Sequence, residues 1–357
     1  MTIQDFTTVF RDCNVLTSTL QYSQMAGYRV AFDASNMIHK YVNKERTKYV
    51  ETLELLFDDP TIDHLEAQAT MYLIKSAIGF MQNGVTPIFV FDGKTPALKA
   101  EFAATKRADD ASKKALKYKT AWSKVLEYRA INEPVPYDVV KLIRDNMDSR
   151  PRQDAIRRVR DILIALGIPA MQAVHEADHV CSRLVEDGIA VAAVTEDRDF
   201  LTHGCPRVIT EYGGGKGTLI CLADVLTSLN MSFSQFRDLC IMLGTDYNNR
   251  IRGYGPVKSL NKMRQWISLD HADIDVSSLN HHAVRNEFKS RPLSELIDPT
   301  IIPRVDIYDI DIDRSISLLT TIDLDHYVTA VEASKSTLMS LLTDGAALSV
   351  PAEYSDV

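Results

Sequence analysis

The stretch Tyr28-Arg-Val-Ala-Phe-Asp33 is an apolar run that ends on an acid, and Thr86-Pro-Ile-Phe-Val-Phe-Asp92 repeats the same form. Both have the length and composition of buried strands. Further strands are predicted at 168–173, 189–195, 207–212 and 218–222, and a turn of three glycines lies between the last two. Apolar residues recur with helical spacing at 64–82 and 154–166. This alternation predicts an α/β fold, in which helices cover both faces of a mostly parallel central sheet.

Length and composition limit the class of protein. With 357 residues, 45% of them hydrophobic, the chain can bury a core in one large domain or two ordinary ones. Its N-terminus has no basic segment leading into an apolar stretch, and no run is long enough to span a bilayer, so a soluble protein without a membrane partner is expected. Five cysteines lie far apart without C-x-x-C spacing, which favours a reducing, intracellular compartment over a disulfide framework or a zinc site. Nucleus and cytoplasm both stay open.

The net charge of −8 hides two basic segments. Residues 94–129 hold ten basic residues against four acids, and residues 248–264 hold five basic residues and no acid. Either segment alone is most simply interpreted as the solvated face of a helix. Because both flank acidic motifs, we interpret them together as surfaces that bind nucleic-acid phosphates.

Seven acidic residues follow the predicted strands or lie in a turn beyond them. They are Asp33, Asp92, Glu176, Asp178, Asp197, Asp199 and Asp246. In a mostly parallel sheet, ligands gather at the carboxyl ends of the strands. A single acid there is more often a helix cap or a turn former. Seven carboxylates converging without a counter-ion would repel one another strongly.

The chemistry of these side chains limits the ion that they can bind. All-oxygen ligands favour Mg²⁺ or Mn²⁺ over zinc. Two such ions about 4 Å apart activate water and stabilise the leaving oxygen in phosphodiester hydrolysis. The residues therefore predict a phosphodiesterase that acts on nucleic acid, with two Mg²⁺ ions as cofactor and Mn²⁺ as a substitute.

Four blocks of sequence narrow the prediction. The first two are Val30-Ala-Phe-Asp-Ala-Ser-Asn and Phe89-Val-Phe-Asp-Gly-Lys-Thr-Pro-Ala-Leu-Lys99. The third runs from Gly167 to Asp178 and continues from Thr195 to Thr202, and the fourth is Leu243-Gly-Thr-Asp-Tyr-Asn-Asn-Arg-Ile-Arg-Gly-Tyr-Gly-Pro256. As an ordered set over residues 1–265, they resemble the flap endonuclease/XPG family of structure-specific 5′ nucleases, which includes exonuclease 1-like members.

The resemblance implies a PIN-like 5′-nuclease fold. A helical arch would be inserted at about residues 95–150, and a helix-two-turn-helix element that binds DNA would lie at about 236–265. We expect a nuclease core over residues 1–265, followed by an extension over residues 266–357 that packs on it.

The resemblance also implies roles for single residues. Asp33, Asp92, Glu176 and Asp178 would serve chiefly one metal ion, and Asp197, Asp199 and Asp246 the other. Lys99 matches a catalytic lysine that contacts the scissile phosphate, and Arg107, or Lys106 just before it, matches a catalytic arginine. His39 takes the place of a residue that stacks on the base next to the scissile bond, although an ordinary histidine on a helix face is a comparable interpretation.

The fourth block implies contacts with the DNA backbone. Gly253 and Gly255 would let backbone amides approach duplex phosphates, and Lys258 and Lys262 would add phosphate contacts. By the resemblance to the family, carbonyls of the same hairpin would also hold a potassium ion. The chain also departs from the family: Thr2 replaces the usual glycine, residues 48–60 are extra, and the C-terminal tail lacks the element that binds the sliding clamp, so clamp tethering is not expected.

These features predict a magnesium-dependent flap endonuclease or 5′-3′ exonuclease. It would act as a monomer on branched or 5′-ended DNA, in replication, repair or recombination. An endoribonuclease that degrades messenger RNA is an alternative on the same fold, because metal chemistry at phosphate ignores the sugar. A second alternative is an inactive scaffold that binds branched DNA, but a scaffold has no need of all seven acids.

Overall fold

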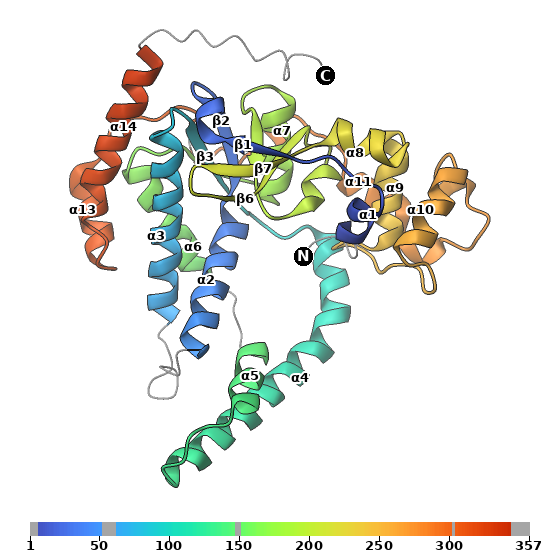
Figure 1. The fold of residues 1–357 in the computed structure, drawn as a ribbon, viewed down its shortest axis with the longest axis horizontal. Helices are drawn as coiled ribbons and strands as arrows, with labels where there is room; N and C mark the ends of the chain where they lie inside the picture. The colour runs from blue at the N-terminus through green and yellow to red at the C-terminus, as the bar shows by residue number, and fades with distance from the viewer. Residues whose placement is uncertain (1–5, 52–61, 147–150, 302–303, 344–357) are drawn as a thin grey trace.

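A seven-stranded sheet forms the centre of the chain (Figure 1). The computed structural model describes residues 6–51, 62–146, 151–301 and 304–343. The strand order is β1-β7-β6-β5-β2-β3-β4. The bounds are β1 Ser18–Gln21, β2 Arg29–Asp33, β3 Thr86–Phe91, β4 Ala170–Gln172, β5 Ala192–Val194, β6 Arg207–Gly213 and β7 Lys216–Cys221. Strands β6, β5, β2, β3 and β4 run parallel, whereas β7 and β1 add an antiparallel edge.

The two strands quoted first are buried on both faces, as their sequences predict. In β2, Ala31 packs into one hydrophobic layer, while Val30 and Phe32 pack into the other. In β3, Ile88 packs into the same layer as Ala31, and Phe89 packs into the opposite layer. Because successive side chains of a strand point to opposite faces, a continuous apolar run requires a cover on both sides. The predicted α/β class, with a mostly parallel sheet between two helical layers, is confirmed.

Helices on each face provide that cover. One layer holds α1 (Phe6–Asp12), α7 (Ala177–Glu186), α8 (Leu222–Leu229), α9 (Phe233–Leu243), α10 (Pro256–Gln265) and α11 (His281–Glu287). The other holds α2 (Ala34–Glu51), α3 (Ile62–Met81), α6 (Gln153–Ala165), α13 (Ile312–Thr320) and α14 (Tyr327–Thr343). Shorter elements are α12 (Leu293–Leu296) and the 3-10 helices η1 (Tyr22–Met25), η3 (Arg198–Leu201), η4 (Leu269–His271) and η5 (Ser277–Leu279).

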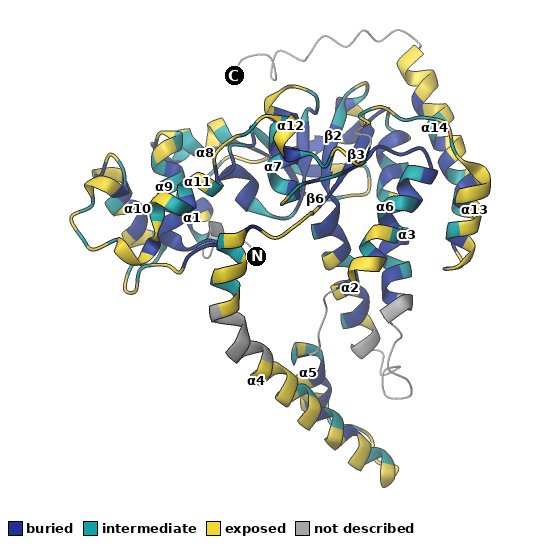
Figure 2. Cartoon of the chain, turned by 180° about the vertical axis from the view of Figure 1, so that it is seen from behind, coloured by how far each residue is buried: buried dark blue, intermediate teal, exposed yellow. Residues whose placement is uncertain are grey.

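A helical limb projects away from the sheet (Figure 1). It consists of α4 (Ala97–Ala130) and α5 (Tyr137–Asn146), which pack on each other through Ala121, Val125, Val139 and Ile143. The chain turns between them at Asn132, whose φ of 56° is in the left-handed region that asparagine tolerates. Much of α4 is exposed along its length (Figure 2). We refer to α4 and α5 as the arch.

Strand β1 was missed by the sequence analysis. Its four residues read Ser-Thr-Leu-Gln, and Leu20 is the one buried among them, so the strand lacks an apolar run. Pairing with β7 supplies its order instead, with Thr19 opposite Thr218.

The segment after residue 265 packs on the rest of the chain at two places. Helix α14 lies beside α3 and buries Val328, Val331 and Leu338 in the core (Figure 1). Residues 296–298 pair with the outer side of β4, where Val174 N donates to Leu296 O at 2.8 Å and Asp298 N donates to Gln172 O at 2.8 Å. The extra residues noted at 48–60 lie largely outside the described residues, since 52–61 are not described.

Cys13, Cys181, Cys205, Cys221 and Cys240 are all free thiols. Within the described ranges, no helix is both long and apolar enough to cross a bilayer.

Candidate metal centre and nucleic-acid interface

Six of the seven predicted acids lie where strands of the parallel sheet end. Asp33 is the last residue of β2, and Asp92 follows β3. Glu176 and Asp178 begin α7, which comes shortly after β4. Asp197 and Asp199 lie at the start of η3, after β5. Because β5, β2, β3 and β4 are parallel neighbours, their carboxyl ends meet at one edge of the sheet.

The carboxylates from different strands are close enough to affect one another. Burial raises the pKa of Asp33 well above its usual range, and the charges of Asp92, Asp178 and Asp197 raise it further. Burial also raises the pKa of Glu176, and the charge of Asp178 adds to this effect. Raised pKa values mean that the ionised carboxylates lack sufficient positive charge around them. Burial and mutual repulsion thus disfavour the ionised forms of Asp33 and Glu176, which a bound cation would favour.

The acids also form the caps and turns that a strand-end acid usually forms. Asp33 Oδ1 accepts the Asn36 N–H at 2.9 Å, at the start of α2. Asp92 Oδ1 accepts the Ala177 N–H at 2.8 Å, and Asp197 Oδ1 accepts the Asp199 N–H at 3.1 Å. Each bond orients its carboxylate while leaving lone pairs for a cation. Capping and metal binding are thus compatible at the same residues.

Lys99 connects the base of the arch to the acids. From the first turns of α4, its Nζ donates to Glu176 Oε1 and forms an ion pair with Asp246 Oδ2 at 2.9 Å. Burial opposes the lysine charge, but Glu176 and Asp246 outweigh that effect and raise the pKa of Lys99. Lys99 is therefore charged, and it links Asp246 to Glu176.

A tight turn after α9 presents Asp246. Gly244 begins it with a φ of 94°, and a Cβ at this position would lie 2.9 Å from the backbone nitrogen of Arg250. Thr245 Oγ1 accepts the Tyr247 N–H at 3.1 Å and lies 2.6 Å from Asn248 Oδ1. The neighbouring Tyr247 hydroxyl donates to Glu176 Oε2. The turn thereby places both Asp246 and Tyr247 against the strand-end acids.

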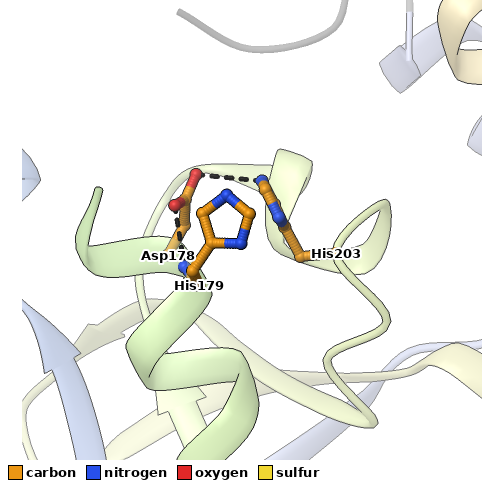
Figure 3. A group of neighbouring side chains, drawn as sticks. All are labelled: Asp178, His179 and His203. Carbon is orange, nitrogen blue, oxygen red and sulfur yellow. Dashed lines mark hydrogen bonds and ion pairs between the residues drawn. The ribbon is translucent and has the colours of Figure 1, made fainter. Parts of the chain in front are cut away.

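Asp178 is held by a histidine that the sequence analysis missed. His203 Nε2 lies 3.1 Å from Asp178 Oδ2, and Figure 3 shows the two side chains facing each other beside His179. Burial opposes the Asp178 charge, but His203, together with His179 and Lys99, lowers the pKa of Asp178 overall. Asp178 thus differs from Asp33 and Glu176, whose pKa values are raised.

The predicted phosphate contacts on the arch are only partly described. Lys106 and Arg107 belong to α4, but their side chains lie outside the described residues. His39 is exposed on α2, in the second turn of the helix that follows Asp33. None of these three is brought into the acid cluster by a described contact.

The predicted hairpin residues lie between α9 and α10. Gly253 is exposed with a φ of 84°, which favours glycine, whereas Gly255 has an extended backbone that other residues adopt equally well. Lys258 is exposed on α10. Lys262 Nζ pairs with Asp273 Oδ2 at 2.7 Å. This pair is on the surface, where an ion pair contributes little stability, so the lysine can be redirected to a phosphate.

Comparison with known proteins adds independent evidence. Two family models match, one described as the XPG N-terminal domain over residues 1–114 and one as the XPG I-region over residues 167–246. Flap endonuclease 1 of Trypanosoma brucei brucei is 30% identical over 291 residues, which cover 79% of this chain and 69% of the relative. The chain belongs to the flap endonuclease/XPG family.

Other members of the family are similar over different lengths. Flap endonuclease 1 of Entamoeba dispar is 29% identical over 253 residues, which cover 70% of this chain and 62% of the relative. The solved flap endonuclease-1 from Methanococcus jannaschii matches with a TM-score of 0.63 at 19% identity, covering 96% of this chain and 99% of that one. The catalytic core of Rad2 in complex with DNA substrate matches with a TM-score of 0.60 at 18% identity, covering 95% and 99%. At these identities the solved structures support the shared fold.

The family match and the acid cluster coincide in sequence. Asp33, Asp92 and Lys99 lie within the XPG N-terminal match, and the other five acids lie within the XPG I-region match, which ends at residue 246. The hairpin glycines, at 253 and 255, follow the second match.

Three residues that support the acids gave no signal in the sequence. His203 contacts Asp178, Tyr247 contacts Glu176, and the Phe288 ring packs edge-on against both His203 and Tyr247. Each contact joins positions at least 25 residues apart, so no local motif could reveal it. Tyr247 fell within a quoted motif, but the motif alone gave it no role.

Proposed function

We propose that this protein is a divalent-metal-dependent, structure-specific nuclease that hydrolyses DNA at 5′ flaps or recessed 5′ ends. One observation carries the proposal: acids from neighbouring parallel strands lie close enough at one edge of the sheet to affect one another, and Lys99 pairs with Glu176 and Asp246 at the base of the arch. Clustered carboxylates are the oxygen ligands that hard divalent ions prefer, and such ions would offset the repulsion between them. Magnesium fits this set best, and manganese can replace it.

The family resemblance suggests how the acids would divide between two ions. We assign Asp33, Asp92, Glu176 and Asp178 to one ion, and Asp197, Asp199 and Asp246 to the other. Bound at this edge, the ions would supply an activated water and neutralise charge on the phosphate. The backbone donors to Asp33, Asp92 and Asp197 keep those carboxylates oriented before any ligand arrives.

The protein's own cations would handle the substrate. Lys99 Nζ already lies among the carboxylates, where it can contact a phosphate oxygen and stabilise the charge that develops there. Arg107, or Lys106, would add a second phosphate contact from the next turns of α4. His39 would stack on the base beside the scissile bond.

The arch and the hairpin would hold the two parts of a branched DNA. Lys113, Lys114, Lys117, Lys119 and Lys124 lie on α4 and suit a single strand with a 5′ end. Gly253, Gly255, Lys258 and Lys262 would contact duplex phosphates, with a potassium ion on the hairpin carbonyls. The Rad2 core, which has this fold, is solved with a DNA substrate. Replication, repair and recombination are the processes that produce such branched DNA.

The rival functions predict different products. An endoribonuclease would cut a matched RNA flap at least as fast as the DNA flap. An inactive scaffold would bind flaps tightly without metal-stimulated hydrolysis, although it would not need seven acids.

A substrate panel tests the proposal. DNA flap, gap, nick, Holliday junction and hairpin RNA are incubated in Mg²⁺, and the cut positions are mapped. We expect cleavage near the base of the 5′ flap, loss of cleavage but not of flap binding in Asp197→Asn, and full activity in Asp224→Asn, an exposed acid on α8. Flap cleavage by Asp197→Asn at the wild-type rate would refute the assigned metal role.

A further inference from the structure

The Asp178 carboxylate has one donor on each oxygen. Oδ1 accepts the His179 N–H at 2.8 Å, and Oδ2 lies 3.1 Å from His203 Nε2 (Figure 3). An ionised carboxylate only accepts hydrogen bonds, so His203 must carry its proton on Nε2. Lone pairs then remain on both oxygens for a cation, while the two donors orient the carboxylate.

Aromatic packing fixes the His203 ring. The ring is 7% exposed, and it lies edge-on to His179 at 4.2 Å and to Phe288 at 4.8 Å between centroids. Its Nδ1 is buried without a hydrogen-bond partner among the described residues. Among the residues that the structure describes, Asp178 and the packed rings therefore set the orientation of the His203 ring.

Phe288 connects this histidine to a second acid. It is 1% exposed, directly follows α11, and also packs edge-on against Tyr247 at 5.6 Å. The Tyr247 hydroxyl in turn donates to Glu176. One ring from the segment after residue 265 thus lies between the two residues that hold Glu176 and Asp178.

We propose that His203 is a positioning residue that holds the Asp178 carboxylate in the orientation in which it binds a divalent ion, and that Phe288 braces it. The proposal rests on the metal-dependent function given above. Groups that hydrogen-bond to metal ligands commonly change metal affinity by about 10- to 100-fold when they are removed. His203 and Phe288 would therefore affect the metal without touching it.

Titration of the protein with Mn²⁺ in a calorimeter, without DNA, tests this role. His203→Phe keeps an aromatic ring but removes the donor, and we expect its Kd for Mn²⁺ to rise about 10-fold. His203→Gln restores an N–H donor and should recover most of the affinity. His326→Phe, at an exposed histidine before α14, should leave the affinity unchanged. Wild-type Mn²⁺ affinity in a folded His203→Phe protein would overturn the proposal.

A double-mutant comparison separates positioning from general structural damage. If His203 acts through Asp178, His203→Phe adds little further loss of Mn²⁺ affinity in an Asp178→Asn background. A further 10-fold loss in that background would show that His203 acts elsewhere. Should His203→Phe fail to fold, Phe288→Leu provides the same test, since it loosens the His203 ring without removing the donor and should weaken Mn²⁺ binding by a smaller factor.

The two proposals fail separately. A protein whose Mn²⁺ affinity depends on His203 as described, but which cuts no flap, refutes the nuclease function and leaves the positioning role intact. A protein that cuts flaps with unaltered Mn²⁺ affinity in His203→Phe refutes the positioning role alone.

Discussion

The ion pair between Asp238 on α9 and Arg285 on α11 should be costly to break from one side. Asp238 is 1% exposed, and its two oxygens accept Arg285 Nε and Nη2, both at 2.6 Å. Asp238 Oδ2 also accepts the Leu269 N–H at 2.8 Å. Arg285→Met keeps most of the side-chain stem but leaves this buried carboxylate without its partner cation. Removing one member of a buried pair costs about 3–5 kcal/mol. We expect the lower end, about 3 kcal/mol, because Arg285 is itself partly open to water.

A surface pair of the same length provides the control. Arg183 Nη2 lies 2.6 Å from Asp187 Oδ1, but both side chains are 29% exposed. Arg183→Met should therefore cost only about 0–1 kcal/mol. Urea denaturation gives the midpoint and slope for both variants. Adding Asp238→Asn to Arg285→Met should recover part of the loss, because it removes the buried charge but keeps an acceptor for Leu269. Equal losses in Arg285→Met and Arg183→Met would refute the argument that burial decides the cost.

Two further outcomes are expected. Burial and neighbouring carboxylates raise the pKa of Asp33 above its unfolded value of about 3.9. The stability that this carboxyl contributes is therefore complete below the unfolded pKa, and it is lost as the pH rises through the pKa of the folded protein. In EDTA, Asp33→Asn should therefore melt above the wild type at neutral pH, with the gain fading toward pH 4; a gain that is constant with pH would contradict this. A Cβ on Gly93 would lie 2.1 Å from Ala173 O and 2.4 Å from Val174 O, so Gly93→Ala should lower both melting temperature and cleavage, whereas Gly79→Ala on α3, with nothing within 4 Å, should be neutral or stabilising. Unchanged melting of Gly93→Ala would show that this close approach is not required.

The sequence predicts those features that depend on local pattern. Strands β2 and β3 were predictable because a short, continuous apolar run must be buried on both faces. A parallel sheet covered by helices on both sides provides that burial. The shared location of Asp33 and Asp92 was predictable because a residue that ends a parallel strand lies at the edge where the other strands end. Strand β1 was not predicted because its mostly polar residues give no strand signal, and pairing with β7 supplies its order.

Contacts between distant segments could not be predicted from one sequence. The distance from His203 to Asp178 depends on how η3 sits against α7, and Phe288 reaches both His203 and Tyr247 only because α11 packs on α9. The choice between Lys106 and Arg107 stays a prediction, since their side chains are not among the described residues.

The pairing of residues 296–298 with β4 also affects the solubility of the chain. A strand at the end of a sheet has unpaired N–H and C=O groups that can recruit a strand from another molecule. Here Leu296 and Asp298 occupy those groups on Gln172 and Val174. The opposite border ends in β1, which is only four residues long and mostly polar, and so is a poor template. A chain shortened to residue 265 would keep all seven acids but uncover β4, and we expect it to self-associate rather than persist as a minimal enzyme.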